Sequence, residues 1–124
     1  LERFIEIKQE NYHRYREKIE RIPGLSLLPF KEGTRPNYWF YSLVCEESYP
    51  FKRDELIHYL ASKNVQTRPI WGLINEQPPY QECQAFEIDK AKHYLNCIVN
   101  IPCSSNLSKE DLLYVVSCLE VESN

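Results

Sequence analysis

Arg68 and Trp71 are the residues whose types and spacing most suggest chemistry. They lie in the stretch TRPIWGLINEQPPY (Thr67–Tyr80), which packs an arginine, a tryptophan, three prolines and a tyrosine into fourteen residues. A guanidinium held at the end of a strand can make paired hydrogen bonds to a carboxylate or a phosphate. The indole of Trp71 can form a flat wall against a ring, or it can fill the gap between the loop and a helix. Residue types alone leave both choices open, because most arginines at strand ends are simply solvated.

Other kinds of catalytic or binding site find little support. The three glycines are too far apart for a phosphate-binding loop, and the three histidines lack the spacing of metal ligands. Ser104 and Ser105 precede the pattern of a helix cap, which indicates a turn rather than a nucleophile. The lysines fall on polar helix surfaces or in a loop, where nothing favours their uncharged form for Schiff-base chemistry. We therefore expect no catalytic residue and no metal site in the chain taken alone.

A long first helix is predicted over residues 1–22. Its apolar residues recur at steps of three and four, which places them on one face. They are Leu1, Phe4, Ile5, Tyr12, Tyr15, Ile19 and Ile22. Pro23 and Gly24 end the helix.

The rest of the chain alternates short strands with helices. The predicted strands are Leu25–Phe30 at an edge, Tyr38–Cys45 in the centre, Val65–Arg68 stopped by Pro69, and Cys97–Pro102. The predicted helices are one that begins near Asp54 and ends at Asn64, one over Glu87–Asn96, and one that runs from a cap at Ser108 to about Leu119. This order predicts an α+β fold, with a small, mostly antiparallel sheet and helices packed on one face.

Length and composition set the broad class. The 124 residues suit a single domain, and 43% hydrophobic with 27% charged residues is too apolar for a disordered chain. A net charge of −3 argues against nucleic acid and against an anionic membrane as partners. No apolar run approaches the ~20 residues of a membrane span. The five cysteines include no C-x-x-C pair, which favours a reducing cytoplasm, and Cys45, Cys97 and Cys118 are interpreted as small core residues.

Three segments together resemble one known family. They are NYWFYSLV, then KRDELIHYLASKNVQTRPIWGLINEQPPY, and finally IVNIPCSSNLSKEDLLYVV. The combination is similar to the C-terminal small domain of the DegT/StrS-type nucleotide-sugar aminotransferases, which are pyridoxal-phosphate-dependent enzymes of fold type I. The likeness covers roughly Leu1 to Leu119, and TRPIW with QPPY ahead of IPCSSNLSKED is its most specific part.

The resemblance implies that this chain is part of a larger enzyme. Residues 1–22 would be the interdomain helix, residues 23–124 the small domain, and an N-terminal large domain with the catalytic lysine would lie upstream. The absence of an initiator Met agrees with an excerpt. Pyridoxal phosphate would bind the full-length homodimer and not this fragment. The enzyme would move an amino group from glutamate, leaving 2-oxoglutarate, to a keto-sugar nucleotide, with a UDP-4-keto sugar for bacterial surface glycans as the finer expectation.

Four residues take substrate-binding roles by the resemblance. Arg68 matches an arginine that faces the active-site mouth, Trp71 shapes that mouth, and Asn37 is the asparagine of the N-x-W pattern. Asn75 stands where many members carry histidine, and an amide can hydrogen-bond but cannot carry a proton charge near neutral pH. The alternatives are a free-standing module that binds a sugar, an anion or a protein without catalysis, and a structural domain with no ligand.

Overall fold

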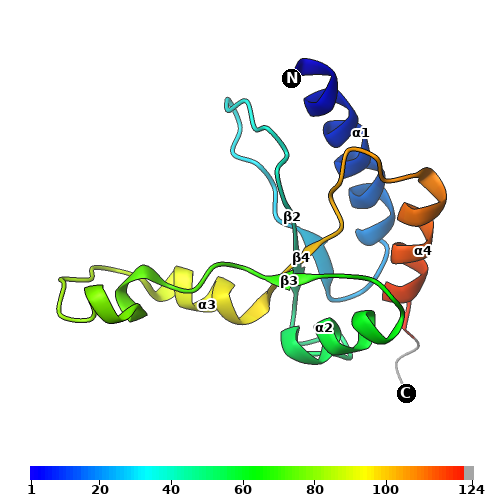
Figure 1. Cartoon of the computed structure of the whole chain (residues 1–124). Coiled ribbons are helices and arrows are strands. Elements are labelled where there is room, and N and C mark those ends of the chain that lie inside the picture. The colour runs from blue at the N-terminus through cyan, green and yellow to red at the C-terminus, as the bar shows by residue number, and fades with distance from the viewer. Residues whose placement is uncertain (122–124) are drawn as a thin grey trace.

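Four strands form one antiparallel sheet in the computed structural model, which describes residues 1–121. Their order across the sheet is β1–β2–β4–β3, so β1 and β3 are the edges (Figure 1). The strands are β1 (Leu25–Leu27), β2 (Tyr41–Cys45), β3 (Arg68–Pro69) and β4 (Ile98–Ile101). Every strand pair is antiparallel, as the sequence predicts.

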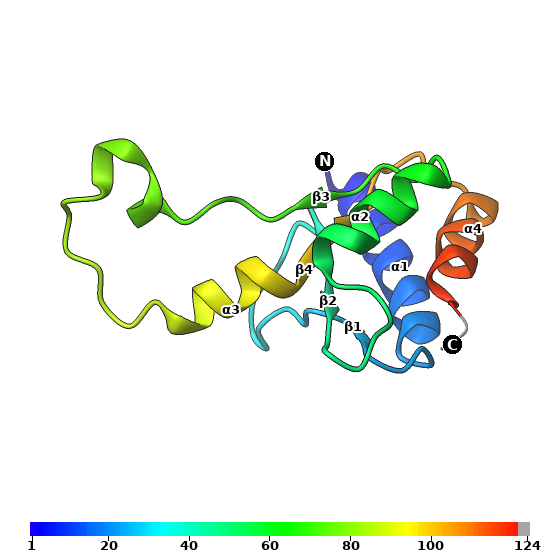
Figure 2. The ribbon, with the colours of Figure 1, turned by 90° about the horizontal axis from the view of Figure 1, so that it is seen from below.

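Three helices cover one face of this sheet, and a fourth leads away from it. The three are α1 (Glu2–Ile19), α2 (Arg53–Ser62) and α4 (Lys109–Leu119). Helix α3 (Asp89–Cys97) instead extends outward from the sheet together with two short 3-10 turns, η1 (Ile74–Glu76) and η2 (Pro78–Tyr80), as Figures 1 and 2 show. None of the residues of α3 is buried. Within residues 1–121, no helix is both long enough and apolar enough to cross a membrane.

A single hydrophobic core lies between the sheet and the three helices. Alternate residues of β2 point into it, because side chains along a strand alternate between the two faces. Tyr41 and Leu43 from β2 meet Tyr15 from α1 and Leu112 from α4 there, and each of the four is at most 1% exposed. The α+β prediction with helices on one face is confirmed.

The first helix differs from its prediction at both ends. It ends at Ile19 rather than Ile22, although Ile22 is still buried just beyond it. Tyr12 and Tyr15 are buried as expected, but Leu1 is 89% and Phe4 57% exposed. The prediction that these last two belong to a buried face is wrong within this chain, because no part of the sheet reaches the first turn of α1.

Lys8 is expected from the sequence on or beside a polar helix surface, and the structure adds contacts there that the sequence does not indicate. It is half-buried, and its ammonium donates to the carbonyl oxygen of Cys103 at 2.5 Å and to that of Trp39 at 3.4 Å. The residue therefore ties α1 to the two loops that flank β2 and β4. An ammonium has three donors, and loop carbonyls that lack a partner in the sheet satisfy them.

The strands are shorter than predicted, for local reasons. Strand β2 begins at Tyr41 and not at Tyr38, because Tyr38 has a φ of 54° and turns the chain. Strand β3 starts at Arg68, where its predicted strand ends, and Pro69 is its last residue. Proline is accepted there because β3 is an edge strand. Helix α2 ends at Ser62, two residues before its predicted end, and Asn64 then takes a left-handed conformation with a φ of 59°.

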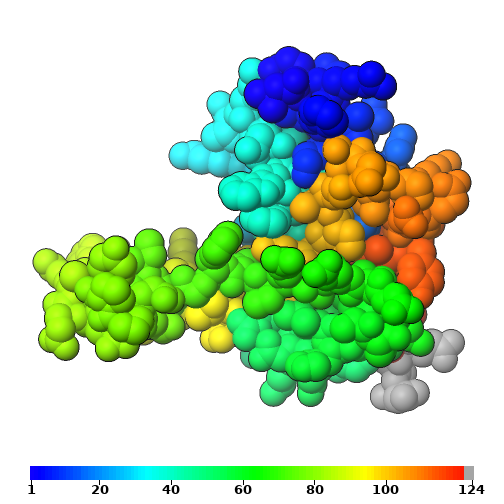
Figure 3. All heavy atoms as spheres, viewed as in Figure 1, coloured from blue at the N-terminus to red at the C-terminus, as the bar shows by residue number. Residues whose placement is uncertain are grey.

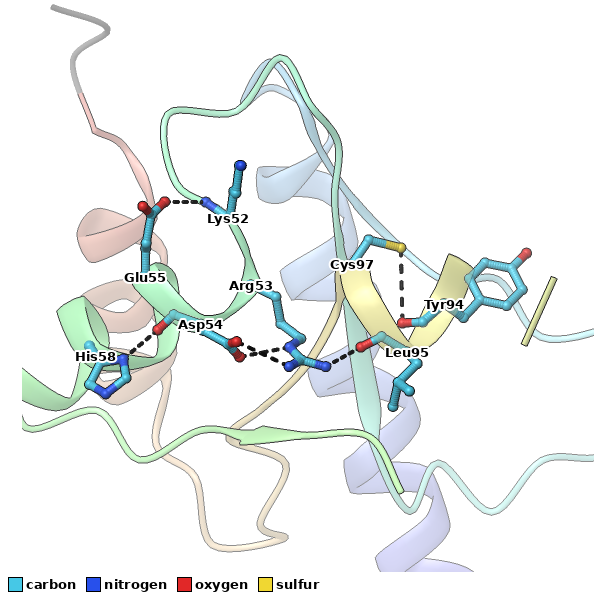
Figure 4. A network of polar contacts seen from close by, with 8 residues as sticks. All are labelled: Lys52, Arg53, Asp54, Glu55, His58, Tyr94, Leu95 and Cys97. Atoms are coloured by element: carbon cyan, nitrogen blue, oxygen red, sulfur yellow. Dashed lines mark hydrogen bonds and ion pairs between the residues drawn. The ribbon is translucent and has the colours of Figure 1, made fainter. Parts of the chain in front are cut away.

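Arg53 connects α2 to α3, as Figure 4 shows. Its guanidinium donates to the carbonyl oxygen of Leu95 in the last turn of α3 and, at 2.8 Å, to the carboxylate of Asp54. A cation suits the C-terminal end of a helix, where the carbonyl groups have no partner in the helix itself. The contact fixes the root of α3 against the body of the domain.

Candidate functional site

Residues 70–97 form an arm that leaves the sheet after β3 and returns to it through α3. Figure 3 shows it projecting from an otherwise rounded body, with η1 and η2 toward its far end in Figures 1 and 2. Large apolar side chains on the arm are uncovered, with Trp71 77%, Ile74 71% and Phe86 76% exposed. Scattered exposed apolar residues are common, but several on one projecting segment indicate a surface that another body of protein covers.

Arg68 lies at the root of this arm, on the sheet face opposite the core. Within β3 and β4 it is paired with Asn100, and Asn100 is paired in turn with Ser42 of β2. Directly paired residues of antiparallel strands point to the same face. Since Tyr41 and Val99 next to them point into the core, Ser42, Asn100 and Arg68 form a polar row on the other face. We call these three residues the polar row.

Burial differs along the polar row. Arg68 is exposed, Ser42 is half-buried, and Asn100 is only 8% exposed. The hydroxyl of Ser42 donates to the carboxamide oxygen of Asn100 at 2.9 Å. An exposed arginine therefore stands beside an almost buried amide that the sheet holds in place.

Trp71 follows three residues after Arg68 and is not a plug. With 77% of its surface exposed, the indole fills no gap between the loop and a helix of this chain. This observation removes one of the two alternatives that the sequence left open. The ring stands at the root of the arm, on the same segment as Arg68.

The two asparagines lie apart from Arg68 and from each other. Asn75 belongs to η1, farther along the arm, and is partly buried. Asn37 lies in the loop between β1 and β2, a separate projection in Figure 1, where its carboxamide oxygen accepts from the backbone amide of Trp39 at 3.0 Å. That bond is a local turn that steers the chain into β2. Arg68 and Trp71 thus lie three residues apart at the root of the arm, whereas Asn37 lies in a different loop.

Asn100 and Ser42 were missed by reasoning from the sequence. The segment IVNI reads as an apolar strand, and one asparagine inside it is the available signal. Asn100 stands out because the strand register places it between Ser42 and Arg68. The sequence does not show this, because register joins segments that are far apart in the chain.

A hollow of about 840 Å³ lies between the end of β2, the start of α2 and α3, and is the other candidate site. Its lining includes Arg53, His93 and Cys97, but Arg53 is already bonded to Asp54 and Leu95. His93 Nε2 lies 3.7 Å from the Cys97 sulfur, and partial burial raises the pKa of that thiol, which keeps it protonated. A protonated thiol is a poor nucleophile, so this hollow is the weaker candidate. Cys97 is also only half-buried, which corrects its interpretation as a core residue, whereas Cys45 and Cys118 are buried as predicted.

Comparison with known proteins bears on the whole chain. A family model described as the DegT/DnrJ/EryC1/StrS aminotransferase family matches residues 1–120. The chain belongs to this family. Among curated members, a dTDP-4-amino-4,6-dideoxy-D-glucose transaminase from Shigella dysenteriae is 25% identical over 107 residues, which cover 85% of this chain and 29% of that protein. A GDP-perosamine synthase from Vibrio cholerae is 21% identical over 123 residues, which cover 97% of this chain and 33% of that protein.

Solved structures of aminotransferases share the fold. The aminotransferase TlmJ from Streptoalloteichus hindustanus superimposes with a TM-score of 0.79 at 20% identity and covers 93% of this chain, which matches 30% of TlmJ. DesI, solved in the presence of its TDP-sugar product, gives a TM-score of 0.82 at 19% identity with the same coverage, 93% of this chain and 30% of DesI. Across these family members, the chain spans about a third of their length or slightly less.

Proposed function

We propose that this chain is the C-terminal small domain of a nucleotide-sugar aminotransferase and supplies one wall of its active site. The observation that carries the proposal is the placement of Arg68, exposed at the root of an uncovered apolar arm in a chain that matches the aminotransferase family over residues 1–120. The family relatives are about three times longer. The arm and the face with the polar row would then pack against, or open toward, the large domain.

Each predicted site residue has a role in this proposal. Arg68 binds the carboxylate of the amino donor or an oxygen of the sugar nucleotide through its planar fork of donors. Trp71 forms the flat side of the opening beside it. Asn75, farther along the arm, contributes a neutral amide group at its margin. Asn37 lies in a separate loop, and its substrate-binding role is proposed on the family resemblance alone.

The residues of this chain do not fit a covalent link to pyridoxal phosphate. A lysine that reacts with an aldehyde must be uncharged, which burial in apolar surroundings favours. None of the eight lysines is buried, and the ammonium of Lys8 is already bonded to loop carbonyls. We therefore assign the cofactor and its lysine to the large domain. The cofactor supplies the electron sink of transamination, and this chain contributes contacts on the substrate side.

The substrate is proposed to be a nucleotide-linked keto sugar. Relatives named for dTDP-linked and GDP-linked sugars support that class. On the resemblance of the TRPIW and QPPY motifs we propose a UDP-4-keto sugar, with glutamate as the amino donor, in a cytoplasmic homodimer that serves surface-glycan synthesis.

The test is Arg68→Ala in the complete enzyme. Loss of a paired contact to an anion should raise the KM of one substrate or lower kcat by tenfold or more, a loss of ~1.4 kcal/mol of transition-state stabilisation. Arg21→Ala is the matched control, because Arg21 is exposed, lies just beyond the C-terminal end of α1 and pairs with Glu17 of that helix. Kinetics of Arg68→Ala that equal those of Arg21→Ala would remove Arg68 from the site.

The alternative of a free-standing module is tested by the intact mass of the native protein. A native chain some 250 residues longer, roughly one or two further domains, agrees with the proposal. A native chain close to 124 residues would contradict it and would leave a binding module without catalysis.

A further inference from the structure

We infer that Asn100 is a second substrate-binding residue, which together with Arg68 binds one anionic group that carries oxygen atoms, a carboxylate or a phosphate. Ser42 acts as a positioning residue for the Asn100 carboxamide. The identity of the substrate rests on the proposed function, but the binding of an anion by these two residues does not.

Register brings the two donors together. Arg68 of β3 and Asn100 of β4 are direct partners, so their β-carbons are about 5 Å apart on one face of the sheet. The helices pack on the opposite face, where the core lies. The Arg68 and Asn100 side chains therefore rise side by side from the face that the helices leave uncovered.

The hydrogen-bonding chemistry of the pair requires an acceptor from elsewhere. Ser42 donates to the Asn100 carboxamide oxygen, which turns the acceptor end of that amide toward β2. The amino end then lies toward β3 and Arg68. An amide NH₂ and a guanidinium carry only donors, so they cannot bond to each other. A ligand oxygen placed between them would accept from both.

Burial shows that this donor is not an ordinary surface amide. Asn100 is 8% exposed, and its carboxamide oxygen accepts from Ser42. Its Nδ2 is not among the fully buried side-chain atoms that lack a partner within residues 1–121, so the amino group can be reached from the surface. Its strand neighbours Ile98, Val99 and Ile101 are all apolar, so a fourth apolar residue would fit the strand better. A ligand that accepts from this amino group explains why an asparagine stands there.

The experiment uses the full-length protein and measures binding directly by isothermal titration calorimetry. Glutamate and 2-oxoglutarate probe for a carboxylate, and UDP and dTDP probe for a diphosphate. The variants are Asn100→Asp, Asn100→Ser, Arg68→Gln and Ser42→Ala.

A carboxylate at position 100 would repel an anion and pair with Arg68, so Asn100→Asp should raise the Kd by tenfold or more. Loss of the aligning hydroxyl in Ser42→Ala should raise it less, by about threefold, since a neutral hydrogen bond contributes less than a charged one.

Two control variants match these changes in chemistry but lie outside the polar row. Asn96→Asp adds the same negative charge on exposed α3, and Ser26→Ala removes a hydroxyl from β1, where Ser26 pairs with Val44 on the same sheet face. Both should bind every probe as the unmodified protein does. Circular dichroism checks that each variant is folded, and Asn100→Ser replaces Asn100→Asp if the charged variant does not fold.

The pattern across probes decides the inference and names the source of the anion. The inference is supported if both the Asn100 variant and Arg68→Gln bind one class of probe more weakly. Weaker binding of glutamate and 2-oxoglutarate indicates an amino-donor carboxylate, and weaker binding of UDP and dTDP indicates a nucleotide phosphate. Unchanged binding in folded Asn100 variants would overturn it, as would the absence of binding of all four probes to the unmodified protein. Transamination by the unmodified enzyme is assayed separately, so a failure of the proposed function is recognised on its own.

Discussion

Arg68 and Trp71 are the strongest candidates for substrate-binding residues, because both are exposed on a segment that cannot bend freely. Pro69 lies between them and fixes its own backbone φ, and Pro78 and Pro79 stiffen the same segment farther on. Stiffness reduces the conformational entropy that a side chain loses when it contacts a ligand. Exposure and stiffness together favour a binding role over a packing role.

Trp71 should therefore matter for activity and not for stability. Trp71→Ala removes a side chain that is 77% exposed, so the melting temperature should change by no more than about 2 °C. Tyr41→Ala is the contrasting variant, because Tyr41 is fully buried and its loss should cost about 3–5 kcal/mol. Thermal unfolding of both variants tests this. A large drop in melting temperature for Trp71→Ala would mean that the indole packs against the protein after all.

The sequence allowed us to predict a site residue where a local motif marks it. It did not where the residue's role depends on strand register. Arg68 was found because it stands at the end of a strand before proline, within a family pattern. Asn100 was not found, because its significance comes from pairing with Ser42, 58 positions away. The contacts of Lys8 were not found for a similar reason, since its carbonyl partners include Cys103, 95 positions away.

Among the elements, helices and caps were predicted well and the arm was not. Helix α4 begins at the cap that Ser108 and Asp111 form and ends at Leu119, because capping residues and apolar periodicity are local signals. Strand β3 has only two residues, so it offers no periodicity to detect. The arm is held by few contacts with the body, and nothing in its own composition sets the direction in which it projects.

Arg53 should control how firmly α3 is attached. Arg53→Met keeps the length of the side chain but removes its bonds to Leu95 and Asp54. The last turn of α3 should then exchange its amide hydrogens faster, while those of α1 and α4 remain as protected as before. Hydrogen exchange followed by mass spectrometry measures both regions in one sample. Arg14→Met is the control, because Arg14 pairs along α1 with Glu10, at 3.5 Å. Equal exchange of α3 in the two variants would show that Arg53 does not hold it.

The molecule as a whole has a core rich in tyrosines and cysteine, which makes its stability sensitive to alkali. Burial raises the pKa of the Cys45 thiol from 9.0 to about 12 and raises the pKa of the phenols of Tyr15, Tyr41 and Tyr49 above their ordinary value. The folded state keeps these protons where the unfolded state has lost them. Their contribution is thus fully present below about pH 9 and declines as the pH rises toward 12.

We therefore expect the free energy of unfolding to fall by about 2 kcal/mol or more between pH 8 and pH 10.5. Urea unfolding at the two pH values measures the difference. Cys45→Ala should show a smaller decline, because one of the titrating groups is gone. Cys83→Ala should decline like the unmodified chain, because Cys83 is exposed. A free energy of unfolding that is constant across this range would contradict the protonated core.

The uncovered arm also predicts how the chain behaves without the rest of the enzyme. Apolar side chains that a large domain would cover should instead meet those of a second copy, so the isolated chain should self-associate as its concentration rises. Light scattering at two concentrations about tenfold apart measures this.

A triple variant with Trp71→Ser, Ile74→Ser and Phe86→Ser should remain monomeric, because it removes the most exposed apolar side chains of the arm. Leu113→Ser is the control on α4, outside the arm, and should associate like the unmodified chain. If the triple variant associates as strongly as the control, the arm is not the surface through which the isolated chains associate.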